Sequence, residues 1–104
     1  LEFNRRGGVG AISVTANIAP KLCSKFQALS ILKDNDSIKK AKSFDDILQP
    51  LHNAMFVESN PSPVKFAAKQ LGLCDDAVRL PLVNVTEQTK KIINKALQST
   101  NLIK

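Results

Sequence analysis

The sequence predicts an α/β chain that is mostly α-helical by itself and contains a single β-strand. Two observations support this fold class. Apolar residues recur at helical spacing in four segments, and one short run rich in β-branched residues, 11–15, is typical of a strand buried on both faces. A length of 104 residues corresponds to one small domain with a modest core.

The predicted strand has no partner within the sequence. Its backbone N–H and C=O groups need neighbouring strands, and no second segment of comparable β character is present to supply them. We therefore expect residues 11–15 to complete a sheet supplied by something else, most simply by upstream residues of a longer chain. The glycines before this run, Gly7, Gly8 and Gly10, favour a tight turn into it. They do not indicate a phosphate loop, because such a loop follows its strand and precedes a helix.

Four helices are predicted after the strand. The first begins near Pro20 and ends before the polar residues 34–36, the second spans residues 37–58, the third begins at Pro63 and is capped by Gly72, and the last is capped by Thr86 and ends near residue 99. Residues 78–85 are expected to be extended. Pro50 is expected to kink or break the second helix near residues 46–49, because proline lacks the N–H donor and clashes with the carbonyl four residues earlier.

The charge of the chain indicates a solvated surface. The formal net charge is +6, from 15 Lys and Arg against 9 Asp and Glu. The basic residues are interspersed with acidic ones and are not interleaved with aromatic residues on which bases would stack, so we expect no nucleic-acid partner. The apolar run after Arg5 and Arg6 superficially resembles a signal sequence, but Ser13, Thr15 and Asn17 interrupt it. We expect no membrane partner.

The residues that often carry chemistry form no recognisable motif. Cys23 and Cys74 make neither a CxxC pair nor a metal site, and we expect two buried, reduced thiols in a cytoplasmic protein. His52 is the sole histidine. We expect it to be structural, since no Ser, Cys or carboxylate stands at a spacing that suggests a triad or a metal pair. No metal and no cofactor is predicted.

Several segments, taken in order, resemble a known family. They are GGVGAISVTAN at residues 7–17, PLHN at 50–53, FVESNPSPVK at 56–65, LGL at 71–73 and RLPL at 79–82. This pattern resembles the dihydrodipicolinate synthase and N-acetylneuraminate lyase family over residues 7 to 97. The resemblance implies the C-terminal part of a (β/α)8 barrel, with strand 8 and helix 8 in residues 1–33 and a C-terminal helical extension in residues 34–104. Because a complete barrel takes about 250 residues, the chain is expected to be a fragment.

The resemblance also implies an activity. In this family a lysine on the sixth strand forms a Schiff base with pyruvate, and the resulting enamine attacks an aldehyde. In the members that serve lysine and diaminopimelate biosynthesis the aldehyde is aspartate semialdehyde. The Schiff-base lysine, a tyrosine and threonine proton relay and a substrate-binding arginine match positions upstream of this sequence, so the chain alone is expected to be inactive. No catalytic residue is predicted within it.

Three residues match positions near the family's active site. Ile12 matches a strand-8 position that borders bound pyruvate through its main chain. The competing interpretation is a core isoleucine, and both can hold because barrel strands place side chains in the packed interior while their C-terminal ends face the active site. Phe56 and Asn60 match positions near the pocket mouth, where they are candidate lining residues. Lys65 belongs to the helical PVK motif and is expected to be structural.

The resemblance further implies a homotetramer or homodimer for the full-length protein. Arg5 and Arg6 depart from the family, whose members often have apolar or small residues in this helix, which contributes to tetramer contacts. Two arginines there put the usual dimer-of-dimers assembly in doubt. An alternative function is an independent basic helical module for binding or assembly, which the charge and the helical content favour.

Overall fold

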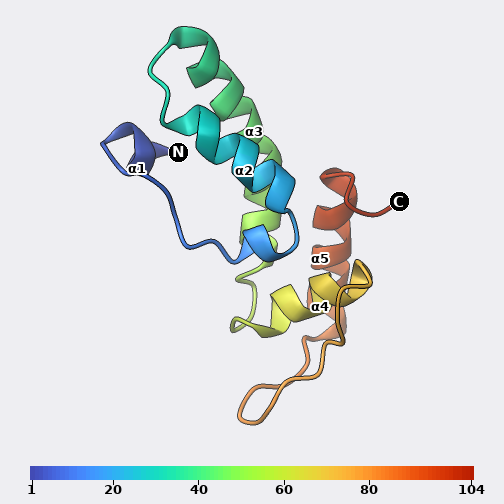
Figure 1. The fold of residues 1–104 in the computed structure, drawn as a ribbon. Helices are drawn as coiled ribbons and strands as arrows, with labels where there is room; N and C mark the ends of the chain where they lie inside the picture. The colour runs from blue at the N-terminus through green and yellow to red at the C-terminus, as the bar shows by residue number, and fades with distance from the viewer.

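The computed structural model describes all 104 residues and contains helices but no strand. The elements are α1 (Glu2–Arg5), the 3-10 helix η1 (Thr15–Asn17), α2 (Pro20–Ser30), α3 (Asn35–Ala54), α4 (Ser62–Gln70) and α5 (Glu87–Ser99). Helix α2 runs alongside α3, and α4 and α5 pack together near the C-terminal end of α3 (Figure 1). The molecule is elongated, because its radius of gyration is 14.7 Å where a compact 100-residue domain has about 13 Å.

The predicted strand at residues 11–15 does not form in this chain. Residues 9–13 have no regular secondary structure and donate no backbone hydrogen bond, and Thr15 already belongs to η1. A strand exists only through bonds to a neighbouring strand, and the chain supplies none. The absence of the strand agrees with the expectation that residues 11–15 complete a sheet supplied by a longer chain.

Helix α3 spans Asn35–Ala54 and continues through Pro50, so the predicted break does not occur. Asp34 begins the helix by accepting a hydrogen bond at Oδ1 from the Ser37 N–H, 2.9 Å away. Proline leaves the carbonyl of Asp46 without its helical donor. Both Asp46 and Pro50 are exposed, so this carbonyl lies on the face where water can replace the lost bond.

The caps predicted for the last two helices are confirmed. Gly72 follows α4 with φ of +71°, a left-handed conformation that favours glycine. Its N–H donates to the Lys69 carbonyl and the next N–H, from Leu73, donates to the Ala68 carbonyl, which together form a Schellman motif. Thr86 caps α5 by accepting from the Thr89 N–H at 3.3 Å. Between these caps, residues 78–85 form no helix, but the extended segment predicted there is interrupted by a turn at Leu80 and Pro81, which the Leu82 N–H closes by donating to the Arg79 carbonyl at 3.0 Å.

Two apolar clusters hold the helices together. The larger lies where α3, α4 and α5 meet and contains thirteen buried residues: Ile18, Ala19, Leu51, Ala54, Met55, Val64, Phe66, Ala67, Ala68, Val85, Ile93, Ala96 and Leu97. The smaller consists of Cys23, Phe26 and Leu48, between α2 and α3. Both cysteines are free, but only Cys23 is buried and Cys74 is exposed. The prediction of two buried thiols is therefore wrong for Cys74, which follows the α4 cap outside the core. No helix is both long enough and apolar enough to span a membrane.

Candidate functional site

A groove lies between the end of the segment 7–17 and the beginning of α4. It has a volume of about 430 Å³ and is lined by nine residues, Val14, Asn17, Asn60, Pro61, Val64, Lys65, Ala68, Leu73 and Cys74. We call it the Asn60 groove. It brings together two of the segments that carry the family resemblance, GGVGAISVTAN and FVESNPSPVK, although many residues separate them in the sequence.

Polar contacts around the Asn60 groove fix its walls. The Asn17 side-chain amide donates to the Val14 carbonyl at 3.0 Å, which closes the turn at the end of the segment. Lys65 donates from Nζ to the Ala77 carbonyl, and Ser62 donates from Oγ to the Val83 carbonyl at 2.8 Å. Both bonds hold the segment after α4 against that helix. The Lys65 amine is therefore engaged in a structural contact, in agreement with its expected role.

Glu58 connects the chain before α4 to the beginning of α5. Its Oε1 accepts from the Thr86 N–H at 3.0 Å and from the Thr86 hydroxyl at 2.8 Å. Hydrogen bonds from Thr89 and Thr86 to the charged form lower the pKa of this carboxyl below its ordinary value. Glu58 thus joins the chain before α4 to α5 without lining the Asn60 groove, and its lowered pKa does not suit a general acid.

His52 anchors η1 to α3. Its Nδ1 lies 2.7 Å from Oγ1 of Thr15, which is only 1% exposed. The imidazole is half-buried, and burial lowers its pKa, an effect that the nearby Asp45 charge opposes. A neutral ring with its Nδ1 occupied by Thr15 fits the structural role expected of His52.

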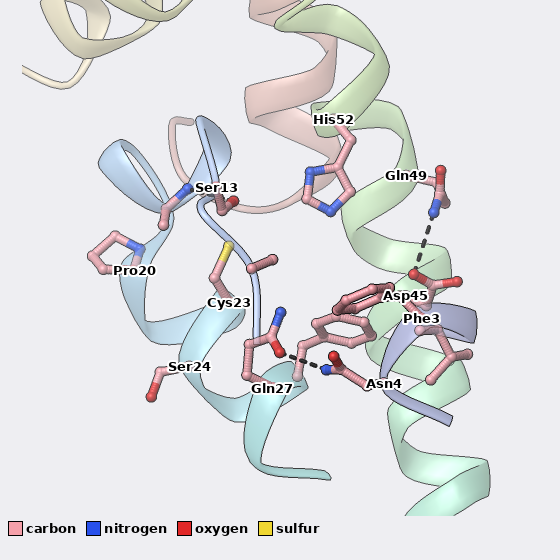
Figure 2. A pocket seen from close by; sticks show the side chains of 14 residues that line it. Phe3, Asn4, Ser13, Pro20, Cys23, Ser24, Gln27, Asp45, Gln49 and His52 are labelled. Carbon is pink, nitrogen blue, oxygen red and sulfur yellow. Dashed lines mark hydrogen bonds between the residues drawn. The ribbon is translucent and has the colours of Figure 1, made fainter. Parts of the chain in front are cut away.

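A second hollow, of about 440 Å³, lies between α1, residues 11–16, α2 and α3 (Figure 2). Ser13, Cys23, Asp45 and His52 all line it, but they do not form a catalytic arrangement. Asp45 accepts from the Gln49 amide at 3.2 Å, and burial raises the pKa of the Cys23 thiol, which keeps this thiol protonated. No group of three or more His, Cys, Asp or Glu side chains is placed to hold a metal ion.

The structure separates the three predicted site residues. Asn60 lines the groove that bears its name. Ile12 lies in neither hollow, and its side chain is fully exposed. Its neighbours Ala11 and Ser13 line the second hollow, and Ile12 points the other way because side chains alternate along an extended backbone. Ile12 therefore lies outside the core of this chain, and both of its expected roles in the complete barrel stay predictions.

Phe56 also lies outside both hollows and is 61% exposed. In its place, the structure adds Asn17 and Val14 to the wall beside Asn60. Sequence analysis missed these two residues. The available signal was their position at the C-terminal end of the strand-like run, since barrel enzymes place their active sites at that end of the strands.

Comparisons with known proteins find one family along almost the whole chain. The model of the Dihydrodipicolinate synthetase family matches residues 1–100. A 4-hydroxy-tetrahydrodipicolinate synthase from Pelagibacter ubique is 67% identical over 103 residues, which are 99% of this chain and 35% of that protein. One from Jannaschia sp. is 52% identical, over 99% of this chain and 34% of its own length. The chain thus spans about a third of the length of the curated relatives it matches.

Solved structures agree with this result. The chloride inhibited dihydrodipicolinate synthase from Acinetobacter baumannii, complexed with pyruvate, superposes with a TM-score of 0.90 at 43% identity, over 98% of this chain and 34% of that one. A monomeric dihydrodipicolinate synthase variant superposes with a TM-score of 0.79 at 36% identity, over 93% of this chain and 31% of that one. The existence of a monomeric variant shows that the oligomeric state differs among these proteins.

Proposed function

Because this chain belongs to the dihydrodipicolinate synthetase family and corresponds to the C-terminal part of its (β/α)8 barrel, we propose that it forms one wall of the active site of a 4-hydroxy-tetrahydrodipicolinate synthase. The reaction condenses pyruvate with aspartate semialdehyde in lysine and diaminopimelate biosynthesis. The complete protein would be a cytoplasmic homotetramer or homodimer.

The Asn60 groove carries this proposal. Active sites of (β/α)8 enzymes lie at the C-terminal ends of the strands. The groove adjoins that end of the segment 7–17 and joins it to the beginning of α4. A substrate pocket at this end would therefore be bordered by both family-like segments.

The residues of this chain would position substrate and exclude water, while the reacting amine would come from the remainder of the barrel. Lys65 is not proposed as the nucleophile, because its Nζ is bonded to the Ala77 carbonyl. Ile12 would border pyruvate with its main chain, whose N–H makes no hydrogen bond within this chain. Asn60 and Phe56 would lie near the pocket mouth, where a polar amide and an aromatic ring suit an aldehyde that carries charged groups.

Borohydride reduction in the presence of pyruvate tests the proposal, because it converts a lysine Schiff base into a stable adduct. The isolated chain is expected to gain no mass. A chimera, in which this chain replaces the matching third of the Pelagibacter ubique relative, is expected to gain one reduced pyruvate per chain, on a lysine outside the replaced third. An adduct on Lys65 or any other lysine of the isolated chain would overturn the proposal, as would a folded chimera without an adduct.

The alternative, an independent basic helical module, is not favoured. The family match extends over residues 1–100 and leaves no separate segment for such a module.

A further inference from the structure

The chain that follows α4 is held in place by two lysines of that helix. Lys65 and Lys69 lie four residues apart, so their side chains project from the same face of α4. Lys65 donates from Nζ to the Ala77 carbonyl. The Nζ of Lys69 lies 2.6 Å from Oδ1 of Asp76 and 3.2 Å from Oδ1 of Asp75. Both lysines therefore bind the same short stretch of chain.

Little else fixes this stretch, residues 74–77, which we call the clamped segment. The Schellman motif reverses the direction of the chain after α4, but its last hydrogen bond is made by Leu73 (Figure 1). None of the residues 74–77 takes part in a hydrogen bond between backbone groups. Cys74 is exposed, so apolar burial does not hold it. The bonds to Lys65 and Lys69 are thus the main contacts that determine where the clamped segment lies.

The ion pair of Lys69 with Asp76 is the better shielded of its two pairs. The Asp76 side chain is only 13% exposed, whereas that of Asp75 is 71% exposed, and a charge-assisted hydrogen bond is stronger where less water reaches it. Hydrogen bonds to these two carboxylates raise the pKa of Lys69 above its ordinary value of 10.5. The ammonium therefore keeps its charge, and with it both bonds, at neutral pH.

The clamped segment forms part of the wall of the Asn60 groove. Cys74 lines this groove and belongs to the helical extension, whereas Val14 and Asn17 line it from the segment 7–17. Lys69 does not line the groove. The position of one groove wall thus depends on bonds that Lys69 makes outside the groove.

We propose that Lys65 and Lys69 are positioning residues, which hold the clamped segment in place as a wall for the aldehyde substrate in the Asn60 groove. This inference rests on the proposed function. In that reaction a lysine of the barrel holds pyruvate covalently, so the aldehyde is the reactant whose place depends on noncovalent walls. A wall that is in place for only about a third of the time raises the KM for the aldehyde about threefold. The capture of pyruvate is unchanged.

Nuclear magnetic resonance relaxation of the chain tests the clamp itself. Lys69→Met removes the ion pairs and keeps a long side chain, and Lys95→Met removes the same charge from an exposed position of α5 as the control. We expect the heteronuclear NOE of the amides of residues 74–77 to fall with Lys69→Met, and further when Lys65→Met is added, while the amides of α4 keep their values. Lys69→Arg keeps the charge and the donors and should restore the NOE. Unchanged values at residues 74–77 in the double variant would overturn the proposal.

The chimera with the Pelagibacter ubique relative tests the effect on the reaction. Lys69→Met is expected to raise the KM for aspartate semialdehyde about threefold, and the double variant with Lys65→Met about tenfold. The yield of the reduced pyruvate adduct and the KM for pyruvate should stay within about twofold, because the barrel lysine is untouched. Lys69→Arg should restore the KM for the aldehyde, and Lys95→Met should leave it unchanged.

Two kinetic outcomes in the double variant would overturn the proposal. One is an unchanged KM for aspartate semialdehyde, and the other is an equal rise in the KM values of both substrates, which would show a general structural role. A chimera that forms no pyruvate adduct before any substitution would refute the proposed function, and the role of the clamp in the reaction with it. The relaxation measurements distinguish this outcome, because they report on the clamp independently of the reaction.

Discussion

The contact between Thr15 and His52 is predicted to hold the segment 7–17 on the helical part of the molecule. Thr15→Val removes the hydroxyl while it keeps the shape of the side chain. Because Thr15 is only 1% exposed, the valine leaves no cavity and admits no water to the Thr15 side of the bond. The variant therefore isolates the 2.7 Å hydrogen bond to His52 Nδ1.

The expected loss follows from the burial of the two groups. Leaving a buried partner without its hydrogen bond costs about 1–3 kcal/mol. His52 is half-buried and regains part of its hydration, so we expect the lower part of that range, about 1–2 kcal/mol. For a chain of this size each kcal/mol lowers the melting temperature by about 4–8 °C.

A double-mutant cycle with His52→Phe isolates the pair. Thermal unfolding of the two single variants and the double variant, followed by circular dichroism, gives the coupling free energy between positions 15 and 52. We expect about 1 kcal/mol. A coupling below about 0.3 kcal/mol, the level at which independent sites simply add, would show that this hydrogen bond does not anchor η1 to α3.

Three further predictions follow from burial and charge. Burial holds the pKa of His52 below its ordinary value of 6.5, so the unfolded chain binds this proton more tightly and stability should fall as pH drops below about 6.5. His52→Phe should flatten the dependence of unfolding free energy on pH in this range, which lies above the range in which carboxyl groups titrate. An unchanged slope would contradict the assignment of this pH dependence to His52. A thiol reagent should modify exposed Cys74 in the native chain and buried Cys23 only after unfolding, so two equally fast thiols would refute the packing of α2. Ile12→Ser should leave stability within about 0.5 kcal/mol and reduce self-association through the unpaired backbone of residues 9–13, whereas Leu51→Ala should cost about 2–5 kcal/mol. Equal losses for these two variants would contradict the assigned core.

Local signals in the sequence predicted the helical elements well. Pro20 begins α2, Gly72 ends α4 and Thr86 caps α5, as expected. Each of these signals depends on the conformation of one residue and on hydrogen bonds within one turn, so the sequence around it contains the required information.

Signals that depend on distant surroundings failed. The run 11–15 has the composition of a strand, but a strand forms only beside a partner. Proline usually kinks or breaks a helix, but Pro50 lies on an exposed face of α3, where the carbonyl of Asp46 that loses its donor can bind water. Cys74 was expected to be buried because it belongs to no CxxC pair or metal site, but it follows the cap of α4 and lies outside the core.

The site was only partly predictable for the same reason. The resemblance predicted Asn60 as a site residue, and Asn60 lines a groove. It did not predict Asn17 or Val14, which line the same groove. It also could not give the contact between Thr15 and His52, because nothing in local spacing relates positions on η1 and α3. Ile12 and Phe56 stay predictions for the complete barrel, since both side chains are exposed in this chain.

We propose that this chain functions as the C-terminal part of a pyruvate aldolase barrel. The most direct test is the condensation rate of the chimera with the Pelagibacter ubique relative, measured with pyruvate and aspartate semialdehyde. We expect a rate within about tenfold of the intact relative, which corresponds to a loss of at most about 1.4 kcal/mol in transition-state stabilisation. A chimera that folds, forms the pyruvate adduct and still condenses more than about a thousandfold more slowly would contradict the claim.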